Sequence, residues 1–416
     1  MLKIVQENQG DYLEFLKKLV SIDSQPGDEK NVAEFLLEEF KQVGVDEAFI
    51  DGAGNVIAVI RGEGRGPNVM LNGHMDIVPA GSLENWGDFD PFTPVVKDGE
   101  LYGRGIADMK GGLGAQIYAF KAIMERVVKR GKKLPGDLTF VGVVQEEPAT
   151  MFGIEYVFDH TMQEHNLKCD VVYIGEPTGT DLIIGQRGKV ELVIKTYGCC
   201  AHSSAPQEGV NALEMMVPVL EDIFSHTGIE LRTDALGWPT PITVTNCIVR
   251  PGGTLSVIPD ECELSVDRRY APGQTLEDLL SEFEAIFKRL STRFPEFKAS
   301  VEPRSFEAKS WTGYAKRVKK FHPAWEIDKD SDLVQKTVNA LHSVGQSPTY
   351  QYCAAGTDGG TTCALHGIPT MMYSGPEPSW AHQPKERASV EKLVASYEGY
   401  IAILAALYGL DTALFD

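Results

Sequence analysis

The segment NVMLNGHMDIV (68–78) is a short apolar run of strand length that carries a histidine and an aspartate near its end. Similar apolar runs follow as DLTFVGVV (137–144), DVVYIG (170–175) and IPTMMYS (368–374), with helical patterns between them, notably from about 111 to 128. Strands that alternate with helices predict a mostly parallel sheet covered by helices on both faces. The fold class is therefore α/β.

The pattern changes near Gly188, where the order becomes strand, helix, strand, strand, helix, strand. This order is typical of a compact α+β unit with two helices against an antiparallel sheet. The 416 residues also exceed the roughly 250 to 300 residues at which a single core stops growing. We expect a catalytic domain formed by residues 1–187 and 309–416, interrupted by a smaller domain at 188–308.

Composition limits the partners that this chain can have. Its formal net charge is −20, which disfavours binding to nucleic acid or to an anionic membrane. No apolar run approaches the ~20 residues that span a bilayer, and the first residues do not resemble a signal peptide. We expect a cytoplasmic enzyme that acts on a small-molecule substrate. The seven cysteines form no CxxC pair, so we expect buried free thiols.

Acidic and histidine side chains follow the predicted strands at their carboxyl ends, which is where open α/β sheets place their sites. Each of these residues alone is more typical of a solvated loop, but their shared edge indicates one site. Two imidazoles with several carboxylates suit Zn²⁺, with Co²⁺ or Mn²⁺ as alternatives, and one acid can bridge two ions about 3.5 to 4 Å apart. The candidates are His74, Asp108, Glu146, Glu147, Glu176 and His382.

Two neighbouring features admit other interpretations. Asp76 lies two residues after His74, on the same strand face, so it is expected to orient that imidazole. The glycine-rich segment GRGIADMKGG around Asp108 could be taken for a phosphate loop, but its spacing fits neither common pattern and its acid would repel phosphate. The remaining histidines, at 160, 165, 226, 322, 342 and 366, lack such context and are expected to be surface or structural.

These segments resemble the M20 metallopeptidases, a family that includes deacylases, desuccinylases and carboxypeptidases. The matching segments are NGHMDIVP, GRGIADMKGG, the Glu146 and Glu147 pair, IGEPT, GQRG, GCCAHSSAPQEGVNAL, VDRR and AHQPKE, and they span nearly the whole chain in family order. The resemblance implies two metal ions, with a general base beside them and a cis peptide between Asp108 and Met109. The implied roles are His74 and Glu176 at one ion, Glu147 and His382 at the other, Asp108 between them and Glu146 as the base.

The resemblance also implies roles for the inserted domain, which the family uses as a lid and for dimerisation. His202 matches a histidine that reaches across a dimer to stabilise the oxyanion. Arg187, Asn246 and Arg269 match residues on the substrate side, where an arginine can clamp a carboxylate through two hydrogen bonds. A homodimer is the expected assembly.

The resemblance implies hydrolysis of an amide bond. An N-acyl amino acid deacylase is the first choice, and it needs a carboxylate clamp, as a peptidase of the family also does. A dipeptidase or carboxypeptidase of the same family is the alternative, and an N-carbamoyl amino acid amidohydrolase matches less well. From a different class, a catalytically silent binding protein would keep the fold and lose the base, whereas every matched position here carries a competent residue.

Overall fold

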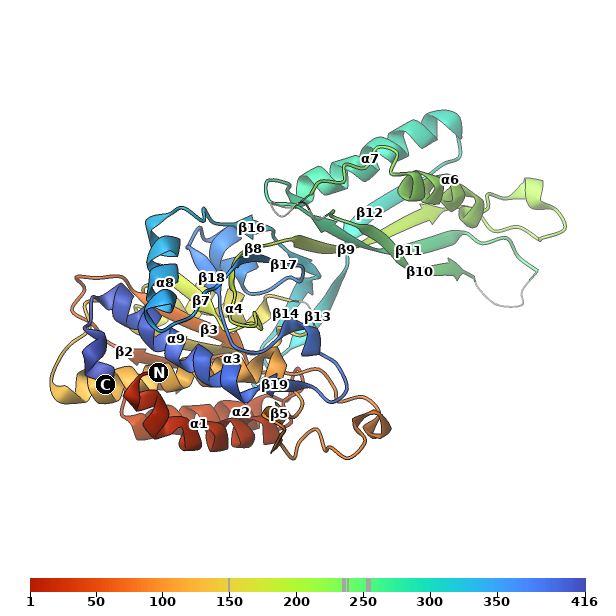
Figure 1. Ribbon diagram of the computed structural model, residues 1–416. Coiled ribbons are helices and arrows are strands. Elements are labelled where there is room, and N and C mark those ends of the chain that lie inside the picture. The colour runs from red at the N-terminus through yellow and green to blue at the C-terminus, as the bar shows by residue number, and fades with distance from the viewer. Residues whose placement is uncertain (149, 234–236, 238, 252–255) are drawn as a thin grey trace.

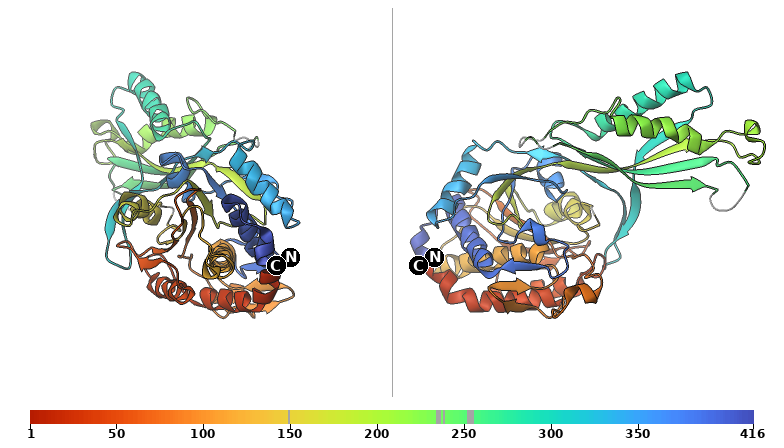
Figure 2. Two further views of the ribbon diagram at one scale, coloured as in Figure 1. Left: turned by 90° about the vertical axis from the view of Figure 1, so that its left-hand side faces the viewer. Right: turned by 45° about the vertical axis from the view of Figure 1, so that its right-hand side comes forward.

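The computed structural model describes residues 1–148, 150–233, 237, 239–251 and 256–416, which form two domains with a sheet in each (Figure 1). The larger domain contains a nine-stranded sheet and the smaller domain a five-stranded sheet. Figure 2 shows that the smaller domain projects from one end of the larger one, and that the two termini lie together at the other end. None of the helices in these ranges has the length and apolar character needed to cross a membrane.

The centre of the larger sheet is parallel, as the alternating pattern predicts. Its strands are fully buried and short, so both of their faces contribute to the core. In spatial order they are β6 (Leu138–Val143), β3 (Val69–His74), β7 (Val171–Ile174) and β18 (Thr370–Met372).

The flanks of this sheet are largely antiparallel. β1 and β2 are joined by a short turn in which Asp51 Oδ1 accepts three successive backbone N–H groups at 3.0 Å. A connection this short permits only an antiparallel pair, because parallel strands need a crossover. The sheet is therefore mixed as a whole and parallel at its centre. The flanking strands are β1 (Glu47–Ile50), β2 (Val56–Ile60), β8 (Leu182–Gln186), β16 (Trp325–Glu326) and β17 (Tyr350–Cys353), of which β17 runs parallel to β8.

Helices cover both faces of the larger sheet. Alternate residues of one strand separate into two cores: Leu71 packs with the cluster under the long helices, and Met70 packs on the opposite face with Ile154 of α4. The predicted coverage of both faces is confirmed. The helices of this domain are α1 (Lys3–Ser21), α2 (Lys30–Val43), α3 (Gly111–Arg126), α4 (Phe152–Tyr156), α5 (Met162–Glu164), α8 (Asp332–Ser343) and α9 (Val390–Tyr408).

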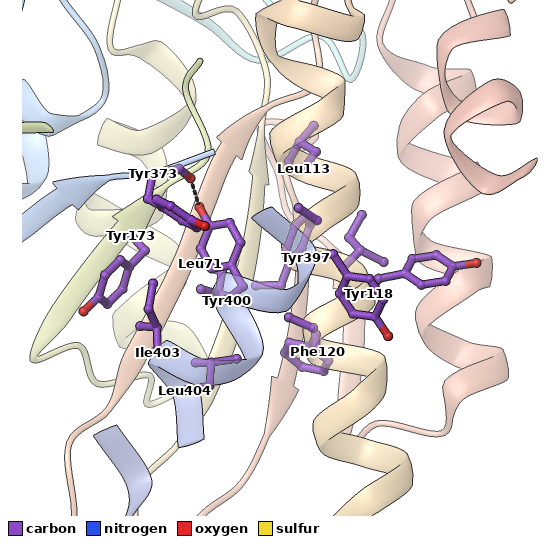
Figure 3. Packing of buried hydrophobic residues seen from close by; sticks show 14 of the residues in the cluster. Leu71, Leu113, Tyr118, Phe120, Tyr173, Tyr373, Tyr397, Tyr400, Ile403 and Leu404 are labelled. Carbon is purple, nitrogen blue, oxygen red and sulfur yellow. Dashed lines mark hydrogen bonds between the residues drawn. The ribbon is translucent and has the colours of Figure 1, made fainter. Parts of the chain in front are cut away.

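The helices α3 and α9 pack against each other over the centre of the sheet. Figure 3 shows their aromatic and aliphatic side chains meeting those of β3 and β7. The hydroxyl of Tyr400 on α9 donates to the carbonyl of Tyr373 at 2.5 Å, just beyond β18. Because buried hydroxyl groups need a partner, this bond fixes α9 against the strand that leads to His382.

The smaller domain follows the predicted order of strand, helix, strand, strand, helix, strand. Its antiparallel sheet has the order β10, β11, β9, β12, and α6 and α7 cover one face (Figure 1). Its elements are β9 (Gly188–Tyr197), α6 (Ala212–Ser225), β10 (Ile242–Arg250), β11 (Glu261–Tyr270), α7 (Leu276–Arg293) and β12 (Ala299–Pro303).

The two sheets meet where β8 ends at Gln186 and β9 begins at Gly188. After β12 the chain forms a hairpin of β13 (Ser305–Lys309) and β14 (Ala315–Lys319), and then β15 (Phe321–His322) pairs with β9. The boundaries at 187 and 308 stay predictions. β15 follows the second boundary along the chain, yet it pairs with β9 in the sheet of the smaller domain. Three short strands, β4 (Val95–Lys97), β5 (Glu100–Tyr102) and β19 (Arg387–Ser389), form a separate sheet.

Candidate metal centre and substrate cavity

The carboxyl ends of the central strands bring the predicted site residues to one edge of the sheet. His74 is the last residue of β3, Glu146 and Glu147 follow β6, and Glu176 follows β7. Because these strands are adjacent and parallel, their ends meet at one edge. The structure places these four side chains together, as the sequence predicts.

Two further residues reach the same edge from loops. Asp108 lies in the turn Ile106–Lys110 directly before α3, and its peptide bond to Met109 is cis, which confirms the expectation from the resemblance. His382 lies in the loop after β18 with a positive φ of 63°. A residue other than glycine is strained in that region, and such strain often marks a functional site.

The distances divide these residues into two groups that share Asp108. His74 Nε2 lies 3.0 Å from Asp108 Oδ1 and 3.8 Å from Glu176 Oε1. His382 Nε2 lies 3.2 Å from Asp108 Oδ2 and 3.1 Å from Glu147 Oε2. Asp108 therefore presents one oxygen to each imidazole. This arrangement offers one carboxylate that bridges two ligand sets.

Burial and mutual repulsion perturb the titration of this cluster. Burial, followed by the charges of neighbouring carboxylates, raises the pKa of Glu146 and of Glu176 well above the ordinary value. Burial also acts to raise the pKa of Asp108, but its hydrogen bonds with His382 and His74 outweigh this effect and lower the pKa. Hydrogen bonds to Asp108 and Glu147 raise the pKa of His382 to about 10. Positive charge is thus strongly favoured at the centre of the cluster.

The donor set fits a cation. Glu147 Oε1 is buried and has no hydrogen-bond partner among the described residues, which is costly for a carboxylate oxygen unless something else binds it. Ligand atoms of His74, Asp108 and Glu147 all lie within 4.8 Å of one another, and so do those of His74, Glu146 and Glu176. Imidazole nitrogens and carboxylate oxygens are suitable ligands for divalent zinc, cobalt or manganese.

Asp76 supports the cluster in a different way from the one expected. Its carboxylate accepts the backbone N–H groups of Glu146 at 3.1 Å and Glu147 at 2.9 Å. His74 Nδ1 donates to the backbone carbonyl of Asp76 at 2.8 Å, whereas the nearer carboxylate oxygen is 3.8 Å away. The main chain of Asp76 therefore orients His74, leaving Nε2 for a metal ion, and its side chain fixes the glutamate pair.

Glu386 is a supporting residue that the sequence did not single out. It is 1% exposed, it pairs with the buried Arg104 at 2.5 Å, and it accepts the backbone N–H groups of residues 105, 107 and 108. These bonds hold the turn that carries Asp108. In the sequence, the only indication of a role for Glu386 was its position at the end of AHQPKE. A sequence motif does not distinguish a buried glutamate from a solvated one.

A cavity of about 600 Å³ opens beside the cluster. One wall, the acidic wall, consists of Asp108, Glu146, Glu147, Glu176 and His382. The other wall, which we call the cationic wall, consists of Lys189, Arg269 and His322, all from strands of the smaller sheet.

His322 was expected to be surface or structural. It is buried, at 1% exposed, and it also lines the cavity. Lys189 was not singled out either. No local pattern marks these two residues, because they meet through the pairing of strands far apart in the sequence.

Three residues to which the resemblance gives roles, the oxyanion candidate His202 and the substrate-side candidates Asn246 and Arg187, lie outside this cavity lining in the described part of the chain. His202 is exposed in the smaller domain, and Asn246 lies on the edge strand β10. Arg187 is buried between β8 and β9, and its backbone N–H donates to the backbone carbonyl of Cys353 at 3.0 Å. Their roles, like those of the cluster residues, stay predictions. The cysteines are free as expected, but Cys199, Cys200 and Cys247 are exposed rather than buried.

A two-domain α/β fold with paired imidazoles and carboxylates beside a deep cavity is the arrangement of a metallopeptidase-type hydrolase. The chain belongs to peptidase family M20/M25/M40, which it matches over residues 70–407. It is 31% identical over 406 residues to the uncharacterized protein YgeY of Escherichia coli strain K12, covering 97% of this chain and 96% of that protein.

One relative with a described activity and one solved structure each match nearly the whole chain. A succinyl-diaminopimelate desuccinylase of Nautilia profundicola is 27% identical over 388 residues, covering 92% of this chain and 95% of that protein. The YXEP protein of Bacillus subtilis, described as a dinuclear metal-binding peptidase, matches the fold with a TM-score of 0.68 at 14% identity, covering 97% of this chain and 99% of that one. The chain is therefore a hydrolase of this family.

Proposed function

We propose that this protein is a two-metal deacylase that cleaves the amide bond of an N-acyl amino acid. The observation that carries the proposal is Asp108, whose two carboxylate oxygens face His74 and His382 separately. His74 and Glu176 would hold one ion, and Glu147 and His382 the other. Zinc is the first candidate, and Co²⁺ or Mn²⁺ can use the same ligands.

The residues around the ions have separate tasks. Two bound divalent cations would supply Lewis acidity for the substrate carbonyl and lower the pKa of a water molecule. Glu146 faces the cavity, where its carboxylate would take the proton of the attacking water and return it to the leaving nitrogen. Asp76 would keep Glu146 in place through the bond to its backbone N–H.

The two walls and the relatives support the proposed substrate class. The scissile amide would lie at the acidic wall, and a carboxylate would lie on the side of the smaller domain, where Arg269 lines the cavity. Arg187 and Asn246 stay predicted contacts to that carboxylate. The desuccinylase relative, which also acts on an acylated amine, favours a deacylase. The peptidase neighbour keeps a dipeptidase or carboxypeptidase as the alternative.

The contacts of His202 favour the tautomer that an oxyanion donor needs. Its Nδ1 accepts the backbone N–H of Ser204 at 3.1 Å and lies 2.7 Å from the hydroxyl of the same residue. A neutral imidazole whose Nδ1 accepts must carry its proton on Nε2. Nε2–H is then available to donate to a developing oxyanion. Since His202 does not line this chain's cavity among the described residues, the site would take it from a second copy.

The smaller domain offers a surface for that second copy. β10 is an edge strand that pairs only with β11 among the described residues, and Ile248 on it is exposed. Leu213, Val217 and Phe224 lie at helical spacing on the outer face of α6 and are 39%, 47% and 69% exposed. An unpaired edge beside exposed apolar side chains favours association with an identical edge. We propose a homodimer formed through β10 and α6.

A side-by-side assay tests the proposed reaction. Zinc-loaded protein is offered N-acetyl and N-succinyl amino acids, dipeptides and N-carbamoyl amino acids, and the release of free amine is measured. We expect the highest kcat/KM with an N-acyl amino acid. Preference for dipeptides would establish the peptidase alternative, and no turnover of any amide would overturn the proposal.

A mixing experiment tests the dimer. A His202→Ala protein and a Glu146→Gln protein are each expected to be nearly inactive alone. After subunit exchange, a hybrid dimer contains one site with Glu146 intact and His202 supplied by the other copy, so part of the activity should return. As a control, the His202→Ala protein is mixed with a variant that carries both His202→Ala and Glu146→Gln. No copy in this mixture has His202, so no activity should return. A fully active monomer in sedimentation would contradict the dimer.

A further inference from the structure

Three side chains form a row across adjacent strands at the junction of the two sheets. In the register of the smaller sheet, Lys189 on β9 lies opposite Arg269 on β11 and opposite His322 on β15. Directly opposed residues place their side chains on the same face. All three line the cavity that contains Glu146. The row and the acidic wall therefore line the same space, where a substrate would lie.

Arg269 directs three of its five N–H donors to protein groups. Its Nε donates to Asp267 Oδ1 at 2.7 Å, and its Nη1 donates to the carbonyl of Ala354 at 2.7 Å. The second bond holds the loop that forms one side of the cavity. The ion pair with Asp267 balances the charge of Arg269. This arginine therefore lines the cavity and also holds the loop through its bond to Ala354.

Lys189 differs from Arg269 in having no such partner. Its ammonium group forms neither an ion pair nor a hydrogen bond with any of the described residues, although the side chain is half-buried. Burial, and next the charge of Arg269, lower the pKa of Lys189. Asp267 and Glu146 offset part of this effect from beyond ion-pair distance, and an anion bound directly to the ammonium group would offset more of it.

His322 is the third member of this row. Its ring nitrogens are buried and have no side-chain partner within the described ranges, although a backbone hydrogen bond with Thr150 acts on the ring. A Cβ added at Gly356 would lie 2.3 Å from His322 Cγ, so the backbone of the loop packs directly on the ring and fixes it. Burial, with the charges of Lys189 and Arg269, lowers the pKa of His322 to about 3, so the imidazole is neutral. A neutral ring can donate one hydrogen bond to an anion.

We propose that Lys189 is the residue that binds the anionic group of the substrate, a carboxylate, with His322 donating a hydrogen bond to the same group. Arg269 acts as a positioning residue that holds the loop at Ala354. This assignment rests on the proposed function, because it takes the acidic wall as the place of the scissile amide. It makes Lys189 the determinant of specificity for amides that carry a carboxylate on the side of the smaller domain.

Binding to an inactive background separates recognition from turnover. In zinc-loaded Glu146→Gln protein, calorimetry measures the affinities of N-acetyl-L-methionine and its carboxamide, which differ only in the charge of one group. Because a hydrogen bond to a charged group is worth about 1.5 to 3 kcal/mol, we expect Lys189→Met to weaken binding of the acid by about 10- to 100-fold and to leave the amide unchanged. Lys189→Arg should recover most of the loss.

The matched control is Lys195→Met, on the same strand. Lys195 pairs with Glu261 and Glu263 and does not line the cavity among the described residues. In the same Glu146→Gln background, which is the parent protein of this test, we expect Lys195→Met to leave the affinity for both probes unchanged. Equal losses for acid and amide in Lys189→Met, or no loss for either, would overturn the assignment. A parent protein that binds the acid no better than the amide would overturn it too.

The His322 variants complete the test. His322→Leu should weaken binding of the acid, and His322→Asn, which keeps a donor, should weaken it less. An identical effect of both variants would remove His322 from the subsite. If the parent prefers the acid but wild-type protein hydrolyses no acyl amino acid, the proposed function fails and the anion subsite stands. Thermal unfolding and zinc content confirm that each variant is folded.

Discussion

The two walls of the cavity are built in opposite ways. The acidic wall draws each residue from a different strand end or loop of the large sheet, and buried groups such as Asp76 and Glu386 fasten their backbones. The cationic wall draws its residues from neighbouring positions on three paired strands of the small sheet. The acidic wall fixes the positions of the groups that would carry out the reaction. Side chains of the cationic wall can be replaced without moving those groups, so we expect this wall to determine substrate specificity.

Metal removal should have the largest effect, and it should act on the acidic wall alone. Dialysis against a chelator is expected to abolish turnover, and Zn²⁺, Co²⁺ or Mn²⁺ should restore it. The protein should also unfold at a lower temperature, because an ion at 100 to 1,000 times its Kd contributes about 2.7 to 4.1 kcal/mol. Activity and melting temperature measured on the same samples check this. Full activity of a protein shown to be metal-free would contradict the two-metal site.

Replacing Glu146 with glutamine should separate proton transfer from metal binding. We expect kcat to fall by ~10² to 10⁴, the usual contribution of general acid–base catalysis. Zinc content should not change, because Glu146 is not one of the five proposed ligands. Steady-state kinetics and metal analysis are the two measurements. Loss of zinc together with activity would assign Glu146 to the ligand set, and undiminished activity would remove it from the mechanism.

The sequence predicted the acidic wall well because strand ends are local features. An acid that directly follows an apolar strand can be placed without knowing which strands pair, as for Glu176 after β7. The cationic wall could not be placed in this way. Lys189 and His322 are far apart in the chain, and β15 is too short to have a recognisable alternating pattern. The antiparallel pairing at the flanks of the large sheet was also not predicted, because the direction in which two strands pair depends on the connections between them.

Removing Glu386 should destabilise the turn that carries Asp108, and with it the acidic wall. Glu386→Ala leaves the buried Arg104 without its partner and frees three backbone N–H groups in the turn of Asp108. Breaking a buried ion pair typically costs about 3 to 5 kcal/mol. Denaturant unfolding measures the loss, and zinc affinity should fall with it. The control is Glu14→Ala, which breaks an exposed pair with Lys17 and should change little. Equal stability of the two variants would show that Glu386 does not hold the turn.

The smallest effect should come from one methyl group behind the cationic wall. Gly356→Ala places a Cβ 2.3 Å from His322 Cγ, so the ring or the loop must move. Overpacking of this kind costs about 1 to 3 kcal/mol. Gly10→Ala is the matched control: nothing lies within 4 Å of its added Cβ, and alanine in helix α1 should stabilise the protein by about 0.5 to 1 kcal/mol. The same substitution should therefore have opposite signs at the two positions.

The kinetics of Gly356→Ala then distinguish the walls. If His322 belongs to the carboxylate subsite, moving it raises KM for an acyl amino acid, while kcat and zinc content stay close to wild type because the acidic wall is untouched. An equal fall in kcat would mean that the two walls are mechanically coupled through the loop at 354–357. An unchanged KM with the expected loss of stability would make His322 a packing residue and leave Lys189 alone in the subsite.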